Sequence, residues 1–254
     1  MPDRVTLTVA EGVAELRLTR ADAHNAIDYD LVADLLRCVV ALRDDASVRA
    51  VLIGADGANF TVGGDLTYLA DVGDGLAAEL LRMIDPFHEA LATLDELRVP
   101  IVTAVQGAAA GGGLGLLYVA DMVLVAPDAK LVGGFDKLGL SGDGGGTFHL
   151  PRLVGLARAQ RIQTHGYTLR APEAVEWGLA ARIVNGDLRA AGLEEARRMA
   201  AGSTAAYAAQ RELLRRPPAR AHLALETAAM ERLGATRFAQ ERVAEFAARA
   251  AARR

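Results

Sequence analysis

A run of glycines constrains the fold of this chain more than any other feature. Residues 106–115 read QGAAAGGGLG, so five of these ten residues are glycine. The run lies between the apolar stretch VPIVTAV, typical of a buried strand, and LGLLYVAD, which has the pattern of a helix. A strand that ends in glycines and opens a helix leaves free backbone N–H groups at the positive end of the helix dipole. The sequence therefore predicts a site for a negatively charged group here.

Several kinds of anion site use such a turn, and the residue pattern separates them. The chain contains no GxxxxGK[ST] phosphate-binding loop. A dinucleotide-binding G-x-G-x-x-G would need glycine at position 118 after Gly113 and Gly115, but that residue is Tyr118. An oxyanion hole remains, in which backbone N–H groups hold the charge that develops on a reacting oxygen. The alternative is that the glycines only let a helix pack tightly on a sheet.

Apolar patterns along the chain indicate alternating strands and helices. Residues 5–9 and 13–18 alternate apolar and polar positions, as the two strands of a half-buried hairpin do. Helical patterns cover residues 28–44 and 77–97, and continuous apolar strands cover 50–54, 101–105 and 122–126. Continuous apolar strands are covered on both faces, so we predict an α/β fold built from repeated strand, strand and helix units.

The C-terminal part of the chain has a different composition. From about residue 187 it is rich in alanine and arginine and helical in pattern, with a break at Pro217 and Pro218. Weakly apolar helices need a partner surface, so we expect an oligomerisation element, with a solvated helix pair on a monomer as the alternative. We therefore divide the chain into a core of residues 1–190 and a helical region of residues 191–254.

Composition excludes several classes of protein. The chain has 28 basic and 32 acidic residues and a formal net charge of −4, with basic residues spread along it, so no nucleic-acid partner is expected. The single cysteine, Cys38, lies within an apolar helical pattern and is predicted to be a core residue. We find no signal-peptide pattern and no long apolar stretch, so we expect a cytoplasmic protein without a membrane partner.

Four stretches of the chain together resemble the enoyl-CoA hydratase/isomerase, or crotonase, superfamily. They are NFTVGGDL (59–66), VPIVTAVQGAAAGGGLGLLYVADMVLVAPDAKL (99–131), GLSGDGGGTFHLPRLVGLARAQ (139–160) and PEAVEWGLAARIV (172–184). The resemblance implies a crotonase-like spiral of ββα units with a helical C-terminal oligomerisation region. It also implies an acyl-CoA thioester as substrate, a homotrimer or dimer of trimers, and no cofactor or metal beyond the coenzyme A of the substrate.

The resemblance assigns binding roles to particular residues. It implies that the thioester oxygen is held by the backbone N–H groups of Gly64 and Gly112. In RADAHNAI, a basic residue that meets a phosphate of coenzyme A corresponds to His24, and Arg20 could substitute for it. The substrate is expected to contact His24, Ala26, Gly63, Asp65, Leu66, Phe135 and Leu138. Further side chains expected around an apolar or aromatic acyl pocket are Phe60, Tyr68, Leu69 and Phe87.

Two positions bear on the reaction. Family hydratases resemble one another in carrying glutamates at two positions that hold a water molecule, and these positions are Gly115 and Phe135 here. Neither residue can move a proton, so hydration is disfavoured. The stretch around Asp143 is similar to that of 1,2-epoxyphenylacetyl-CoA isomerases and other Δ3-Δ2 enoyl-CoA isomerases, although Gly142 replaces the proline often found there. We therefore expect an enoyl-CoA isomerase in which Asp143 transfers the proton.

Three alternatives remain open at this point. The same stretch also resembles 4-chlorobenzoyl-CoA dehalogenases, in which the aspartate is a nucleophile and a histidine activates water; His88 would be that histidine. A non-catalytic CoA-thioester binding protein is the second alternative. The third is that Asp143 only caps the helix that follows it, because aspartate is a preferred N-cap.

Overall fold

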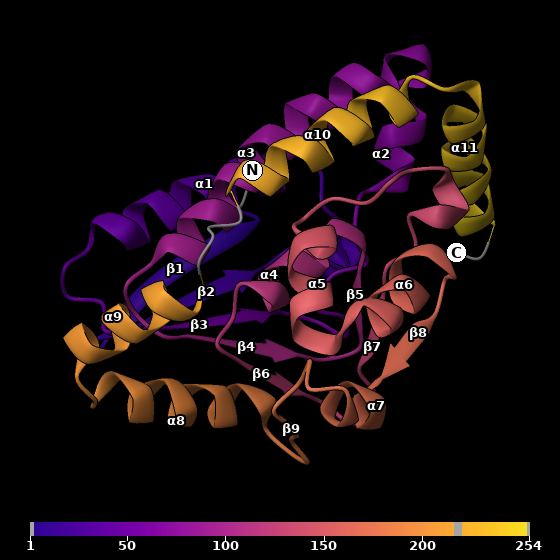
Figure 1. Ribbon diagram of the computed structural model, residues 1–254. Helices are drawn as coiled ribbons and strands as arrows, with labels where there is room; N and C mark the ends of the chain where they lie inside the picture. Colours follow the sequence, from indigo (N-terminus) through magenta and orange to yellow (C-terminus); the bar gives the residue numbers. More distant parts are fainter. Residues whose placement is uncertain (1–2, 216–219, 253–254) are drawn as a thin grey trace.

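The computed structural model describes residues 3–215 and 220–252, and two β-sheets organise it (Figure 1). The larger sheet has six strands in the order β1-β2-β3-β4-β6-β9. These strands are Val5–Ala10, Val13–Leu18, Ala50–Ala55, Ile101–Val105, Met122–Val125 and Arg182–Ile183. The predicted hairpin is confirmed, because β1 and β2 pair antiparallel, while β2, β3, β4, β6 and β9 run parallel.

Helices cover both faces of this sheet. Alternate residues of a strand point to opposite faces, so Val51 and Ile53 join the core under α1 (Tyr29–Asp44) and α3 (Leu76–Glu96). Leu52 points the other way and packs against α8 (Leu188–Ala200). Figure 1 shows α8 on one side of the sheet and α1 and α3 on the other. The predicted α/β fold, with strands buried on both faces, is confirmed.

The smaller sheet carries the glycine run. Its strands are β5 (Ala108–Ala110), β7 (Lys130–Val132) and β8 (Thr168–Arg170). The glycines follow β5 directly as the 3₁₀ helix η3 (Gly111–Leu114), which continues into α4 (Gly115–Tyr118). The chain thus passes from strand to helix at the glycine run, as the sequence predicted.

Shorter elements lie between the strands and helices already described. They are η1 (Ala21–Ala23), α2 (Leu66–Ala70), η2 (Gly73–Gly75), η4 (Asp136–Leu138), α5 (Gly146–Val154), α6 (Leu156–Thr164) and α7 (Ala171–Glu176). The single cysteine, Cys38, lies on the buried face of α1 in the core, as predicted. Within residues 3–215 and 220–252, no helix has the length and apolar character needed to cross a membrane.

The C-terminal helices are α9 (Thr204–Leu214), α10 (Arg220–Gly234) and α11 (Arg237–Ala251). The boundary predicted after residue 190 falls inside α8, which packs on the main sheet. Figure 1 shows α10 lying along α3 and α11 beside α2, so these helices find partner surfaces within their own chain. The predicted break at Pro217 and Pro218 lies outside the described residues.

Candidate active site

Two glycine-containing segments run side by side at the edge of the smaller sheet. Thr61 accepts a hydrogen bond from the N–H of Ala110 and donates its own N–H to Ala108, both at 3.0 Å. Gly63 follows with a φ of +83°, and a Cβ atom there would lie 3.0 Å from the carbonyl oxygen of Ala110. Glycine at this position therefore lets the two backbones come together.

The backbone geometry leaves the N–H groups of Gly64 and Gly112 without partners in their own elements. Ile27 donates to the carbonyl of Gly63 and accepts from the N–H of Asp65, both at 2.8 Å, so the N–H of Gly64 points away from this pairing. Gly112 is the second residue of η3, and an N–H at that position has no acceptor within its helix. Both glycines line one cavity, where the two N–H groups could hold an oxyanion.

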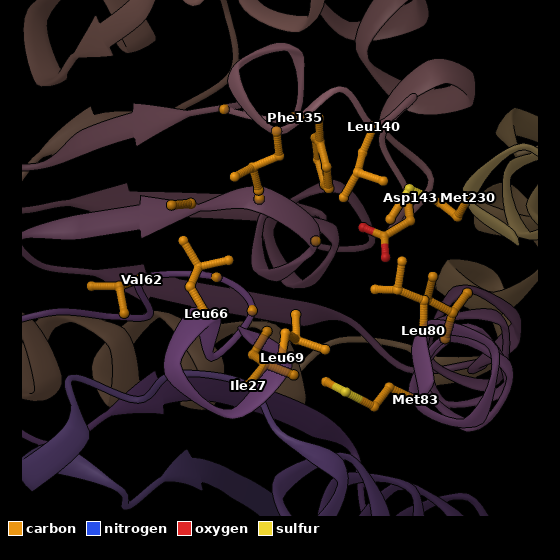
Figure 2. Close-up of a pocket in the computed structure, with 18 of the residues that line it drawn as sticks. Ile27, Val62, Leu66, Leu69, Leu80, Met83, Phe135, Leu140, Asp143 and Met230 are labelled. Atoms are coloured by element: carbon orange, nitrogen blue, oxygen red, sulfur yellow. The ribbon is translucent and has the colours of Figure 1, made fainter. Parts of the chain in front are cut away.

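This cavity has a volume of about 260 Å³ and a mostly apolar lining (Figure 2). Its apolar side chains include Leu69, Leu80, Met83, Ile84, Phe87 and Met230. Its ionisable lining residues, within the part of the chain that the structure describes, are Asp143 and Lys137. Lys137 is exposed, whereas Figure 2 shows the Asp143 carboxyl group pointing into the cavity. An acyl chain would therefore meet a single carboxyl group among hydrocarbon.

Asp143 lies on a glycine-rich loop that packs directly on the glycine run. Gly142, Gly144 and Gly145 have φ values of +94°, +70° and +78°, a conformation that favours glycine. A Cβ atom on Gly112 would lie 2.5 Å from Oδ1 of Asp143. Only a glycine at 112 therefore lets the carboxyl group come so close to the backbone. The capping alternative was wrong, because the N-cap of α5 is Gly145.

Burial changes the acidity of this carboxyl group. Oδ1 of Asp143 is buried and accepts no hydrogen bond from the described residues. Burial raises the pKa of Asp143 from 3.8 to about 7, and the nearby charge of Glu226 acts in the same direction. A carboxyl group with such a pKa can both accept and return a proton near neutral pH.

Positions 115 and 135, where family hydratases carry glutamate, have tightly packed surroundings in this structure. Gly115 is buried, and a Cβ atom there would lie 2.6 Å from Cδ1 of Leu91 and 2.7 Å from the carbonyl oxygen of Gly144. A glutamate at 115 would therefore displace the Asp143 loop. Phe135 lines the cavity and packs against Gly142, where a Cβ atom would lie 3.2 Å from its ring. Neither position offers a group that could hold a reacting water molecule.

The residues expected to contact the substrate divide into two groups. Those lining the cavity are Gly63, Gly64, Leu66, Gly112, Phe135, Leu138 and Asp143, with Leu69 and Phe87 of the expected acyl pocket. The others lie outside the lining: Phe60 is fully buried in the core, and the Tyr68 hydroxyl group bonds to Arg82 at 2.7 Å.

The segment expected to bind coenzyme A lies next to the first glycine segment, since Val62 donates its N–H to the carbonyl of His24 at 3.3 Å. His24 is exposed and Ala26 is buried. Arg20 pairs with Asp28 at 3.1 Å and with Asp65 at 2.8 Å, and Asp65 also caps α2. Two carboxylates therefore already neutralise Arg20, which weakens its expected role at a phosphate.

His88 does not line the cavity. Its Nε2 accepts the N–H of Gly144 at 3.1 Å, and its Nδ1 lies 3.0 Å from the Thr227 hydroxyl group. Burial lowers the pKa of His88 to about 4, so the ring is neutral at neutral pH. Both ring nitrogens are thus engaged with protein groups beneath the Asp143 loop.

Sequence reasoning found Phe87 of α3 but missed the other cavity residues of α3 and those of the C-terminal helices. Leu80, Met83 and Ile84 come from α3, Met230 from α10 and Phe246 from α11. These residues look like any apolar stripe of an amphipathic helix, so no local signal separates pocket from core. Glu226, in the Ala-rich tail, was also missed; it is buried below the Asp143 loop.

Comparisons with known proteins identify the family to which this chain is similar. A family model described as enoyl-CoA hydratase/isomerase matches residues 8–249. The chain is 36% identical over 178 residues to 1,2-epoxyphenylacetyl-CoA isomerase of Escherichia coli (strain K12), covering 70% of this chain and 68% of that protein. It is 32% identical over 206 residues to a 4-chlorobenzoyl coenzyme A dehalogenase of Arthrobacter sp, covering 79% and 73%.

Solved structures share the whole fold. An enoyl-CoA hydratase/isomerase from Mycobacterium paratuberculosis superposes with a TM-score of 0.87 and 27% sequence identity, covering 96% of this chain and 99% of that chain. The match includes the C-terminal helices, because it spans nearly the full length of both chains. The similar proteins thus carry the names isomerase, dehalogenase and probable enoyl-CoA hydratase, and the similar structure is named hydratase/isomerase.

Proposed function

Because the chain belongs to the enoyl-CoA hydratase/isomerase family, we propose that it shifts a double bond in an unsaturated acyl-CoA thioester. One observation carries the proposal. Asp143 is the carboxyl group that lines a mostly apolar cavity, and it lies against Gly112, which lines the same cavity. The Asp143 carboxylate can therefore act as the base next to a backbone N–H group that can stabilise the oxyanion.

The reaction follows from these groups. The Asp143 carboxylate removes a proton from C2 of a 3-enoyl-CoA, between the thioester and the double bond. The C–H electrons form a dienolate, whose oxygen accepts hydrogen bonds from Gly64 and Gly112; each such donor is worth about 3 kcal/mol of transition-state stabilisation. The Asp143 carboxylic acid then returns the proton to C4, which leaves the double bond between C2 and C3.

The raised pKa of Asp143 supports this role. A base must be ionised to take the proton, so kcat/KM should rise with pH up to the carboxyl pKa of about 7 and level off above it. A carboxyl group with an ordinary pKa would be too weak a base for the same step near neutral pH. Measuring kcat/KM between pH 5 and 9 would locate this limb.

Hydration fits the site less well. It needs a water molecule between two acid/base groups, and Gly115 and Phe135 stand at the positions of the family glutamates. The dehalogenase alternative needs a histidine that activates water, and Nε2 of His88 already accepts the N–H of Gly144. The apolar cavity favours a proton carrier over water-consuming chemistry.

The test is one reaction in ¹⁸O-labelled water, with a 3-enoyl-CoA as substrate and products identified by mass spectrometry. We expect a 2-enoyl-CoA without label. A labelled 3-hydroxyacyl-CoA would instead mean that the protein hydrates its substrate without the two glutamates.

Asp143→Asn is the decisive variant, because it keeps the shape of the side chain but cannot carry the proton. It should abolish turnover while the thioester still binds. Equal rates for the variant and the wild type would overturn the role of Asp143. A wild type that binds thioesters, turns over no enoyl-CoA and releases no chloride from 4-chlorobenzoyl-CoA would be a binding protein.

A further inference from the structure

Two buried ionisable side chains beneath the Asp143 loop have no part in the proton transfer. His88 belongs to α3 and Glu226 to α10, and both are buried. Nε2 of His88 lies 4.0 Å from Oε2 of Glu226, so the two helices meet under the loop. Burying an ionisable side chain costs free energy unless it is hydrogen-bonded, so the hydrogen-bond partners of His88 and Glu226 indicate their role.

His88 holds the residue that follows Asp143. Its Nε2 accepts the N–H of Gly144 at 3.1 Å, so in the neutral ring the proton is on Nδ1, which donates to Thr227 at 3.0 Å. Gly144 in turn lies against Gly112, because a Cβ atom on Gly144 would be 2.5 Å from the Gly112 carbonyl oxygen. Moving His88 would therefore move the loop relative to the oxyanion donor.

Glu226 holds the next part of the loop with three hydrogen bonds. Oε2 accepts the N–H of Gly145 at 2.7 Å, and Oε1 accepts the N–H and hydroxyl groups of Thr147 at 2.9 and 2.5 Å. Such donors favour the ionised carboxylate, even though burial raises the pKa of Glu226. One side chain of α10 thus ties down the start of α5.

Within the described residues, Glu226 is the charged side chain that acts on Asp143. The other ionisable groups around the loop are Tyr118 of α4, His149 of α5 and His222 of α10, with exposed Lys137 at the cavity. Burial keeps the pKa of His149 low, near 4, and raises that of Tyr118, so both are neutral. Nε2 of His222 lies 2.7 Å from the hydroxyl group of Thr147, the same hydroxyl group that bonds to Glu226.

We propose that Glu226 and His88 are positioning residues that clamp the Asp143 loop onto the glycine run, and that Glu226 makes catalysis depend on the seating of α10. This inference rests on the proposed function. The clamp acts through the backbone N–H groups of residues 144, 145 and 147. Neither side chain touches the substrate, since neither lines the cavity.

The first test is Glu226→Gln, with Glu231→Gln as its control on the exposed face of the same helix. The amide presents an NH₂ group to one of the loop donors, so kcat should fall roughly tenfold or more while KM changes far less. Loss of the negative charge should also lower the pKa of Asp143, so the acidic limb of the pH–rate profile should move to lower pH. A merely structural defect would lower kcat without moving that limb.

Two matched pairs guard against a variant that fails to fold. Thr147→Ser keeps the hydroxyl group that Glu226 accepts and should retain activity, whereas Thr147→Val should not. His88→Gln can still accept the N–H of Gly144, so it should keep far more activity than His88→Phe, which has a ring of similar size but no acceptor. If His88 were instead a catalytic base, both His88 variants would be equally inactive, and its positioning role would be overturned.

A readout without turnover separates this inference from the proposed function. Hydrogen exchange of the peptide covering residues 141–148 should be at least tenfold faster in Glu226→Gln than in wild type and unchanged in Glu231→Gln. Unchanged exchange and an unmoved pH limb in Glu226→Gln would overturn the clamp. Faster exchange in a protein whose wild type has no isomerase activity would instead keep the clamp and refute the proposed function.

Discussion

The carboxyl group of Asp143 lies where an ionised group costs stability. Its pKa is about 7 in the folded chain against 3.8 ordinarily. Well below pH 3.8 it is protonated in both states, so it costs nothing. As pH rises from 4 to 7 the unfolded chain ionises first, and the folded state loses on the order of 4 kcal/mol relative to it.

Asp143→Asn should therefore stabilise the protein at pH 8. The variant cannot ionise, so its free energy of unfolding should exceed that of the wild type by roughly 1–4 kcal/mol at pH 8, with the difference vanishing near pH 4. Urea unfolding at both pH values would measure this, and Asp74→Asn on the exposed surface is the control. An Asp143→Asn variant no more stable than wild type at pH 8 would contradict a raised pKa.

A substitution at Gly115 tests whether the Asp143 loop can accommodate a glutamate at this position. Gly115→Glu restores the glutamate of family hydratases, but its Cβ would lie 2.7 Å from the Gly144 carbonyl oxygen. We expect a loss of about 1–3 kcal/mol of stability, lower isomerase activity and no hydration. Gly202→Ala, at an exposed helix end, is the control. A labelled 3-hydroxyacyl-CoA formed by Gly115→Glu in ¹⁸O water would show that the loop can make room.

At the scale of elements, one arginine caps the C-terminal end of α3. The side chain of Arg211 in α9 is 3% exposed and donates to the carbonyls of Leu97 and Val119 at 2.9 and 3.0 Å, as well as to Asp95. It also pairs with Asp121 at 3.1 Å. These carbonyls have no partner within their helices, so Arg211 satisfies them and complements the negative end of the helix dipole.

Replacing Arg211 should loosen the C-terminal helices. Arg211→Met removes the donor from the carbonyls of Asp95 and Leu97 and one of the two arginines that pair with Asp121, so we expect a loss of about 3–5 kcal/mol. Arg211→Lys keeps the charge but not the fork of donors and should lie between. Chemical denaturation measures both, with Arg237→Met, at a side chain 90% exposed, as a control within about 0.5 kcal/mol of wild type. Equal stability of all three variants would refute this role.

At the scale of the whole molecule, the single chain leaves large apolar side chains in water. Leu213 and Leu214 at the end of α9 are 70% and 84% exposed, and Leu225 of α10 is 67% exposed. A subunit contact would bury them, and the family resemblance implies a trimer or dimer of trimers. Light scattering should therefore give three or six times the chain mass of 26.7 kDa.

A double substitution tests whether this subunit contact involves the end of α9. Leu213→Glu with Leu214→Glu should lower the mass towards that of one chain, because a carboxylate is costly in an apolar interface. Leu156→Glu, at another exposed leucine on α6, tests whether the effect is local. A monomeric wild type would refute the oligomer, and an unchanged mass in the double variant would move the contact elsewhere.

The sequence by itself determined the backbone of the site. Glycines at 63 and 112 and the loop around Asp143 are visible in the chain because glycine alone permits the close approaches and the positive φ values found there. The same local patterns gave the strands, the helices and the family resemblance. They placed Phe135 and Leu138 correctly at the cavity, since both lie next to the motif that carries the resemblance.

Only the tertiary structure decided what surrounds and tunes Asp143. Glu226 meets Gly145 across 81 residues, and His88 meets Gly144 across 56. Met230 and Phe246 join the cavity from helices that the sequence marked only as a tail. The physical reason is that burial, charge and a raised pKa depend on which side chains of distant helices pack together, and local periodicity records the face of a helix but not its neighbour.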